Sequence, residues 1–251
     1  MTPVPHTRRR VLVAGGAGAL GSAVLEHLLA SGAFAQVAVL VEQPLNVALR
    51  RLVAVPLRSL DEALTRGEAE DTAIVVFDRE RHANGREQAF ARPRPEALPA
   101  LAAQLHRRGV RRLVVVVPHA AASLPQALRQ GLANLDEHAV ASLGFEHLVF
   151  IRSAQASQAQ REEGAMQRLA HWVLAQLQLM IPQRDKPVRP AKIAQFAAQL
   201  AAQLPQAPHG TRVVPPEVVW EAAQARDVQA LAHDWLQGRH MPDSTPQRMR
   251  M

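Results

Sequence analysis

The chain has 251 residues, a formal net charge of +7 and an apolar content of 48%. This length suits one large α/β domain, and the apolar content supports a sizeable core, which excludes global disorder. The absence of cysteine excludes disulfides, thiolate nucleophiles and cysteine-ligated zinc, and no apolar run resembles a signal peptide or a membrane span, so we expect a cytoplasmic protein.

A glycine-rich loop follows the first predicted strand, at residues 10–14, and leads into an amphipathic helix predicted over about 20–30. The loop has the sequence GGAGALG over residues 15–21. Glycine lets the backbone turn sharply and approach a pyrophosphate at a helix N-terminus. The pattern predicts a dinucleotide site, the alternative being a turn that only shapes the fold. The predicted cofactor-binding positions in this loop are Gly15, Ala17, Gly18, Ala19, Leu20 and Gly21.

Strands and helices then alternate as far as residue 152. The uninterrupted apolar run at 113–117 is typical of a strand covered on both faces. Alternation of this length predicts a parallel, doubly wound α/β sheet of the Rossmann type. Further strands are predicted at 36–41, 52–55, 73–77, 113–117 and 147–151, and further helices at 95–108 and from Ser123 to a stop at Gly144.

The regular alternation of strands and helices ends after residue 152. A polar loop is predicted at 153–161, and amphipathic helices at 166–177, at 191–204 and after an N-cap at Asp227, with a short strand at 211–214. We therefore expect three parts. They are a Rossmann-type dinucleotide-binding core at 8–152, a small C-terminal substrate-side lobe at 153–240 and a flexible tail at 241–251.

Five segments occur in a characteristic order: the glycine loop, Gly109–Val116, Leu143–Arg152, Pro187–Ala194 and Gly210–Val214. Together they resemble the atypical, NAD(P)-binding branch of the short-chain dehydrogenase/reductase family, which includes nucleoside-diphosphate-sugar epimerase-like and flavin-reductase-like proteins. The similarity covers most of residues 8–220. It implies a Rossmann-type fold and a nicotinamide dinucleotide, NAD(H) or NADP(H), as cofactor.

The chain departs from that family at the catalytic positions. The family has a catalytic serine after the fifth strand and a Tyr-x-x-x-Lys pair on the next helix, whose tyrosine moves a proton beside the hydride. This chain contains no tyrosine, and its only lysines are Lys186 and Lys192. After the fourth strand, where the family often has a small residue against the cofactor, this chain has Phe77 and Asp78. Asp78 is also a predicted cofactor-binding residue.

Other residues are candidates by their position. Glu42 follows the second strand, about 20 residues after the glycines, where an acid would bond the adenosine ribose and favour NAD over NADP. The alternatives are a solvated loop glutamate, or rescue of a 2′-phosphate by Arg50 and Arg51. His119 and Ser123, after the fifth strand, are the catalytic candidates, against a loop histidine and a helix N-cap. The remaining histidines lack metal-site spacing, so the sequence predicts no metal site.

The positive charge does not by itself indicate a nucleic acid partner. Arginine outnumbers lysine in an alanine-rich chain, which is typical of a GC-rich bacterial genome, and the arginines are scattered apart from residues 8–10. Few aromatic side chains are present to stack on bases. We expect a dinucleotide as the main partner, with a homodimer or a protein partner also open.

Three functions remain open at this point. The first is a degenerate member of the resembling family that binds NAD(P)(H) as a sensor, structural subunit or assembly partner. The second is an NAD(P)H-dependent oxidoreductase or epimerase-like enzyme with a non-standard site, because hydride transfer belongs to the cofactor. The third is a nucleotide-free interaction scaffold in which Asp78, Arg79 and Glu80 fill the site.

Overall fold

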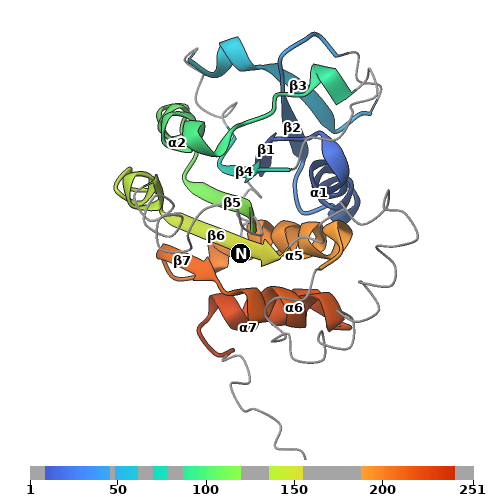
Figure 1. Cartoon of the computed structure of the whole chain (residues 1–251), viewed down its shortest axis with the longest axis vertical. Helices are drawn as coiled ribbons and strands as arrows, with labels where there is room; N and C mark the ends of the chain where they lie inside the picture. The colour runs from blue at the N-terminus through green and yellow to red at the C-terminus, as the bar shows by residue number, and fades with distance from the viewer. Residues whose placement is uncertain are drawn as a thin grey trace, which may run out of the picture.

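A computed structural model of the chain describes residues 9–45, 49–61, 70–78, 87–119, 136–154 and 188–240 (Figure 1). Within these residues seven strands form one sheet in the order β3-β2-β1-β4-β5-β6-β7, and every neighbouring pair is parallel. The strands are β1 (Arg10–Ala14), β2 (Gln36–Val41), β3 (Leu52–Pro56), β4 (Thr72–Val76), β5 (Arg112–His119), β6 (His147–Ala154) and β7 (Gly210–Val214).

Helices cover both faces of this sheet. The described α-helices are α1 (Gly18–Ser31), α2 (Leu98–Arg107), α5 (Pro190–Gln203), α6 (Pro216–Gln224) and α7 (Val228–Leu236). Short 3₁₀ turns are η1 (Leu57–Asp61), η2 (Glu87–Ala89), η3 (Pro95–Ala97) and η7 (Leu204–Gln206). None of the helices in the described ranges is long and apolar enough to cross a membrane.

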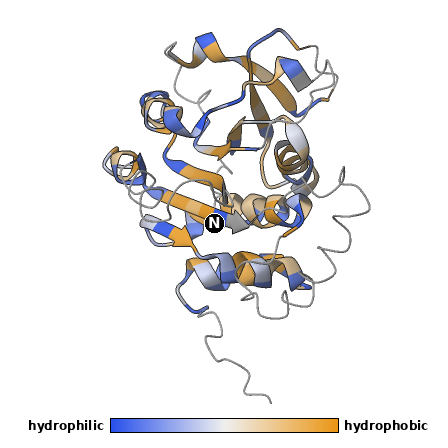
Figure 2. Ribbon diagram, viewed as in Figure 1, coloured by the Kyte–Doolittle hydropathy of each residue, from blue (hydrophilic) through white to orange (hydrophobic). Residues whose placement is uncertain are grey.

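The alternation of side chains along the strands creates two cores. In β1, Val11 and Val13 belong to the core that α1, α5, α6 and α7 cover, whereas Leu12 and Ala14 belong to the core on the α2 side. Both sets are buried, so the central strands are apolar on both faces, and Figure 2 shows hydrophobic residues along them. The predicted doubly wound parallel sheet is confirmed.

The strand order reverses between β1 and β4, the two central neighbours from which β2 and β3 extend to one side and β5 to β7 to the other. In open parallel sheets, ligands bind beyond the carboxyl ends of the strands at such a switch point. The glycine loop leaves β1 there, and residues 77 and 78 leave β4 there. The topology therefore brings the predicted cofactor positions to one place.

Most predicted elements are present with small shifts. The strands at 10–14 and 36–41 have the predicted bounds, whereas β6 continues to Ala154, so Ser153 and Ala154 lie in a strand and not in the predicted loop. Helix α6 was not predicted. Of the helix predicted from Ser123, residues 136–141 are described and helical. Residues 120–135, the helix predicted at 166–177 and the tail at 241–251 lie outside the described residues.

The C-terminal residues extend the same sheet and the same helical layer. Strand β7 pairs with β6, and α5 packs against α1 within one core. The sheet therefore continues past residue 152, where we expected the core to end. The division into a core and a substrate-side lobe stays a prediction, because residues 155–187 lie outside the described part of the chain.

Candidate functional site

At the glycine loop, the backbones of β1, β4 and α1 approach one another closely. Gly15 has φ +90°, and a Cβ atom at this position would overlap the carbonyl oxygen of Val76 in β4. A Cβ atom at Gly21 would overlap the carbonyl oxygen of Gly15, because the first turn of α1 rests directly on the loop. These two glycines are therefore required by contacts within the protein itself, whether or not a ligand binds.

Asp78 places its carboxylate against the first turn of α1. Its Oδ2 atom accepts a hydrogen bond of 2.7 Å from the backbone N–H of Leu20. A Cβ atom at Gly18 would lie 2.5 Å from the same oxygen. The N-cap residue of α1 is Ala17, whose side chain cannot accept a hydrogen bond. Asp78 therefore supplies, from the end of β4, the anionic cap that a helix N-terminus attracts.

This contact engages a backbone donor that we predicted would face a cofactor. The side chain of Leu20 is fully buried, so the residue offers a ligand only its N–H group, whereas Ala19 is exposed. The structure thus brings Gly18, Leu20 and Asp78 together. The arrangement shows that the N-terminus of α1 holds an anionic oxygen at the switch point, which is the chemistry that a pyrophosphate would need there.

An aromatic side chain that sequence analysis left unassigned packs beside the loop. Phe90 forms an antiparallel bridge with Val41 at the end of β2. Its Cδ1 atom would lie 3.2 Å from a Cβ atom at Gly16. The backbone N–H of Glu42 donates to the carbonyl oxygen of Ala89 at 2.8 Å, which fixes this segment along β2. A single aromatic residue outside any strand or helix pattern gave no sequence signal for this contact.

Glu42 follows β2 directly and is exposed at the carboxyl end of the sheet, the location predicted for a ribose-binding acid. Arg51 lies at the other edge, immediately before β3, whose first residue pairs with Val37 near the start of β2. The Nη2 atom of Arg51 donates to the carbonyl oxygen of Leu29 at 2.6 Å. Arg51 is therefore placed to bind the end of α1 and is separated from Glu42 by the length of β2.

The catalytic candidates are placed only in part. His119 is the last residue of β5 and pairs in register with Ala154 of β6, whereas Ser123 lies outside the described residues. Near this end of β6, Arg152 forms an ion pair with Glu137, its Nη2 atom lying 2.8 and 2.6 Å from the two carboxylate oxygens. Sequence analysis missed this pair because it joins a strand to a neighbouring helical segment.

The strand order and the glycine loop define a Rossmann-type α/β protein. We found no match among protein-family models or among curated proteins. Among solved structures, the Bordetella bronchiseptica enzyme WbmG in complex with NAD is similar at 16% identity, over 88% of this chain and 81% of that chain, with a TM-score of 0.48.

Two further solved structures are similar at comparable levels. MoeE5 in complex with UDP-glucuronic acid and NAD has 16% identity over 82% of this chain and 75% of that chain, with a TM-score of 0.48. UDP-N-acetylglucosamine 4-epimerase from Bacillus cereus has 13% identity over 88% of this chain and 83% of that chain, with a TM-score of 0.41. The strand order of this chain establishes the fold class by itself.

Proposed function

We propose that this protein binds a nicotinamide dinucleotide, NAD(H) or NADP(H), at the glycine loop and acts as a sensor, structural subunit or assembly partner. The observation that carries the proposal is the anionic oxygen held by the N-terminus of α1 at the switch point. When bound, the dinucleotide would supply hydride transfer. The chain has no tyrosine that could act as the proton donor of the family that it resembles, which is why the proposed role is not catalytic.

Asp78 determines how well this site fits a pyrophosphate. The Leu20 N–H and the glycine loop are suitable for a phosphate oxygen, but the Asp78 carboxylate lies where that oxygen would bind. The Asp78 carboxylate and a phosphate oxygen at the same position would repel each other. The dinucleotide must therefore displace the Asp78 side chain, and we infer that Asp78 acts as an internal competitor that weakens binding.

Calorimetric titration with NADH tests this competition. Asp78→Ala removes the competing carboxylate, so we expect NADH to bind this variant at least about tenfold more tightly than the wild type. Asp78→Asn keeps a capping group without the charge and should change the affinity in the same direction. Asp227→Asn is the matched control, since Asp227 caps α7 through its Oδ1 atom, 2.9 Å from the N–H of Ala230, away from this site.

The outcome that contradicts the proposal is equally definite. If NADH at millimolar concentration binds neither the wild type nor the folded Asp78→Ala protein, no dinucleotide site exists at the loop.

Oxidation of NADH with flavin, quinone and carbonyl acceptors should stay at background. Turnover that disappears in His119→Ala would instead support the enzyme with a non-standard site.

Glu42 sets our expectation for the choice of cofactor. Its exposed carboxylate at the end of β2 would accept hydrogen bonds from ribose hydroxyls and repel a 2′-phosphate. Measured in the Asp78→Ala background, NADH should bind more tightly than NADPH, and Glu42→Gln should reduce that difference. Equal affinities for the two dinucleotides, unchanged by Glu42→Gln, would remove Glu42 from the site.

A second candidate function has a specific observation in its favour. Gly15 and Gly21 each face a backbone oxygen that a Cβ would overlap, so these two loop glycines are explained without any ligand. In that case Asp78 is a permanent cap and the protein is a nucleotide-free interaction scaffold. Asp78→Ala would then lower the free energy of unfolding by about 1 kcal/mol, the usual effect of losing a cap, and would gain no NADH binding.

A further inference from the structure

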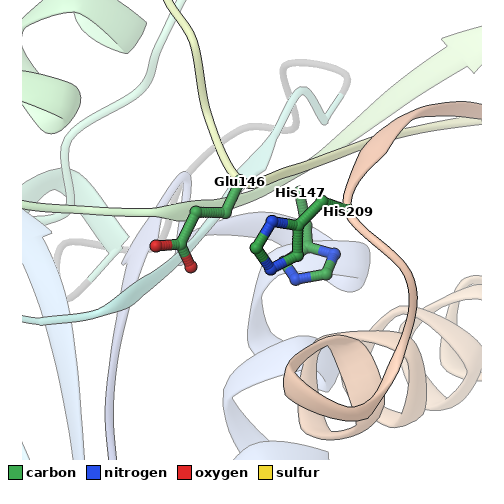
Figure 3. Close-up of side chains that lie close together, drawn as sticks. All are labelled: Glu146, His147 and His209. Carbon is green, nitrogen blue, oxygen red and sulfur yellow. The ribbon is translucent and has the colours of Figure 1, made fainter.

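At the amino-terminal edge of the sheet, opposite the glycine loop, the structure groups two histidines and a glutamate. Glu146 and His147 stand at the start of β6, and His209 immediately precedes β7 (Figure 3). The potential ligand atoms of these three residues lie within 4.8 Å of one another. We propose that Glu146, His147 and His209 form a binding site for a divalent transition-metal ion of the zinc class.

Strand pairing holds the backbone of this cluster in place. The N–H of Gly210 donates to the carbonyl oxygen of Glu146 at 2.9 Å, and His147 pairs in register with Gly210. Arg212 braces the preceding loop, with its Nη2 atom 2.7 Å from the carbonyl oxygen of Pro208. Hydrogen bonds at Pro208 and at Gly210, on either side of His209, thus hold its backbone next to the sheet.

The second observation that points to a ligand is the state of His147. Its side chain is 1% exposed, and its Nδ1 atom has no hydrogen-bond partner among the described residues. Its ring stands edge-on to that of His209, with ring centres 4.8 Å apart. A buried imidazole nitrogen without a partner costs free energy, and a metal ion bound at Nδ1 of His147 would remove that cost.

Glu146 retains an oxygen for the ion. Its Oε1 atom lies 3.0 Å from Nη1 of Arg111, whose side chain is 68% exposed, whereas Oε2 has a longer contact of 4.0 Å with Nη2 of Arg112. Ligating carboxylates are commonly held by a second hydrogen bond of this kind. These arginines also repel a cation, so we expect micromolar rather than nanomolar affinity.

The donor set selects the class of metal. Two imidazoles and one carboxylate suit zinc and its neighbours better than magnesium or calcium, which prefer oxygen ligands. A tetrahedral ion with bonds of about 2 Å holds its ligands about 3.3 Å apart, so the side chains must close by about 1.5 Å. Glu146 is partly exposed and His209 is exposed, so both have room to move toward the buried His147.

Titration of Zn²⁺ into tag-free, chelator-treated protein tests the site by calorimetry. We expect one ion per chain in the wild type, and a loss of affinity of at least about tenfold in His209→Ala and in Glu146→Gln. His209 is exposed, so its substitution leaves the fold intact, which circular dichroism checks. His138→Ala, which removes another exposed histidine, is the matched control and should bind like the wild type.

Cobalt absorption gives an independent readout of histidine coordination. The wild type and His138→Ala should develop the visible bands of bound Co²⁺, and His209→Ala should not. The proposal is overturned if the wild type binds no Zn²⁺ below about 100 μM, if His209→Ala binds as tightly as the wild type, or if His138→Ala weakens binding equally. Neither the Zn²⁺ titration nor the Co²⁺ absorption depends on the proposed dinucleotide site, which lies at the opposite edge of the sheet.

Discussion

Asp78 and Leu20 form the contact on which the candidate site depends, although 58 positions separate them in the chain. The sequence indicates the donor, since the glycine loop predicts a helix N-terminus, and it indicates that an acid follows β4. It does not indicate that the carboxylate reaches the Leu20 N–H. That contact follows from the adjacency of β1 and β4, which is a property of the sheet and not of either segment.

The glycines at the two ends of α1 differ in what they tolerate, which gives a stability prediction. A Cβ atom at Gly21 would overlap the backbone of Gly15, so Gly21→Ala should lower the free energy of unfolding by about 3 kcal/mol. Gly32, at the C-cap of α1, has φ +65° and open space around it, so Gly32→Ala should cost about 1 kcal/mol from backbone strain alone. Urea unfolding of both variants measures the difference, and equal effects would contradict the close approach of the backbones at the loop.

His147 predicts a pH dependence of stability. Burial, followed by the neighbouring His209 and two arginines, lowers the pKa of His147 from its ordinary 6.5 to about 4. Between these pH values the unfolded chain binds more protons than the folded one, so the free energy of unfolding falls as the pH drops from about 6.5 to about 4. This group contributes up to about 3 kcal/mol to that fall and nothing further below pH 4.

The measurement is urea unfolding at pH 7 and pH 4.5 in the presence of a chelator, which removes any contribution from bound metal. His147→Leu should show a smaller loss of stability between the two pH values than the wild type does. The exposed His138→Ala should retain the wild-type loss. An identical pH dependence in His147→Leu would show that His147 does not titrate as its surroundings require.

Helix α5 is attached to the rest of the protein through Arg9 as well as through its apolar face. The Arg9 Nη1 and Nη2 atoms donate to the carbonyl oxygens of Ala202 and Ala201, at 2.8 and 3.1 Å, near the end of α5. The guanidinium also lies over the ring of Phe34, 4.8 Å from its centre. Burial lowers the pKa of Arg9 from its ordinary value. Arg9 therefore has a structural role in the fold.

This contact predicts an effect of Arg9 on stability. Arg9→Met should lower the free energy of unfolding by about 2 kcal/mol, because two charge-assisted hydrogen bonds to helix carbonyls are lost. Arg51→Met is the control, since Arg51 also donates to a helix carbonyl but is exposed, and it should cost about 0.5 kcal/mol. Equal costs in chemical unfolding experiments would show that Arg9 does not fasten α5.

At the level of elements, uninterrupted apolar runs located the central strands well, because strands such as β1, β2 and β4 are buried on both faces. Helix α6 was missed, although Pro216 at its first turn and Glu217 beside it are helix-start signals. The bound between β6 and the following segment was also misplaced. Ser153 and Ala154 are weak strand formers by themselves, and their pairing with Pro118 and His119 places them in the sheet.

For the whole molecule, alternation of strands and helices was enough to predict a parallel, doubly wound sheet, whose order then explains why the candidate residues meet. The sequence could not predict the histidine cluster. Its members come from the starts of β6 and β7, and only strand pairing brings His147 beside His209. Spacing rules for metal ligands apply within one helix or turn, so they do not detect a site built across two strands.

We propose that the N-terminus of α1 is an anion site for which Asp78 and a dinucleotide compete. The most direct measurement follows the amide resonance of Leu20 by NMR during titration with NADH, in the wild type and in Asp78→Ala. We predict a saturable shift of this resonance in both proteins, reached at lower NADH concentration in Asp78→Ala. A Leu20 resonance that does not move in either folded protein at millimolar NADH would contradict the claim.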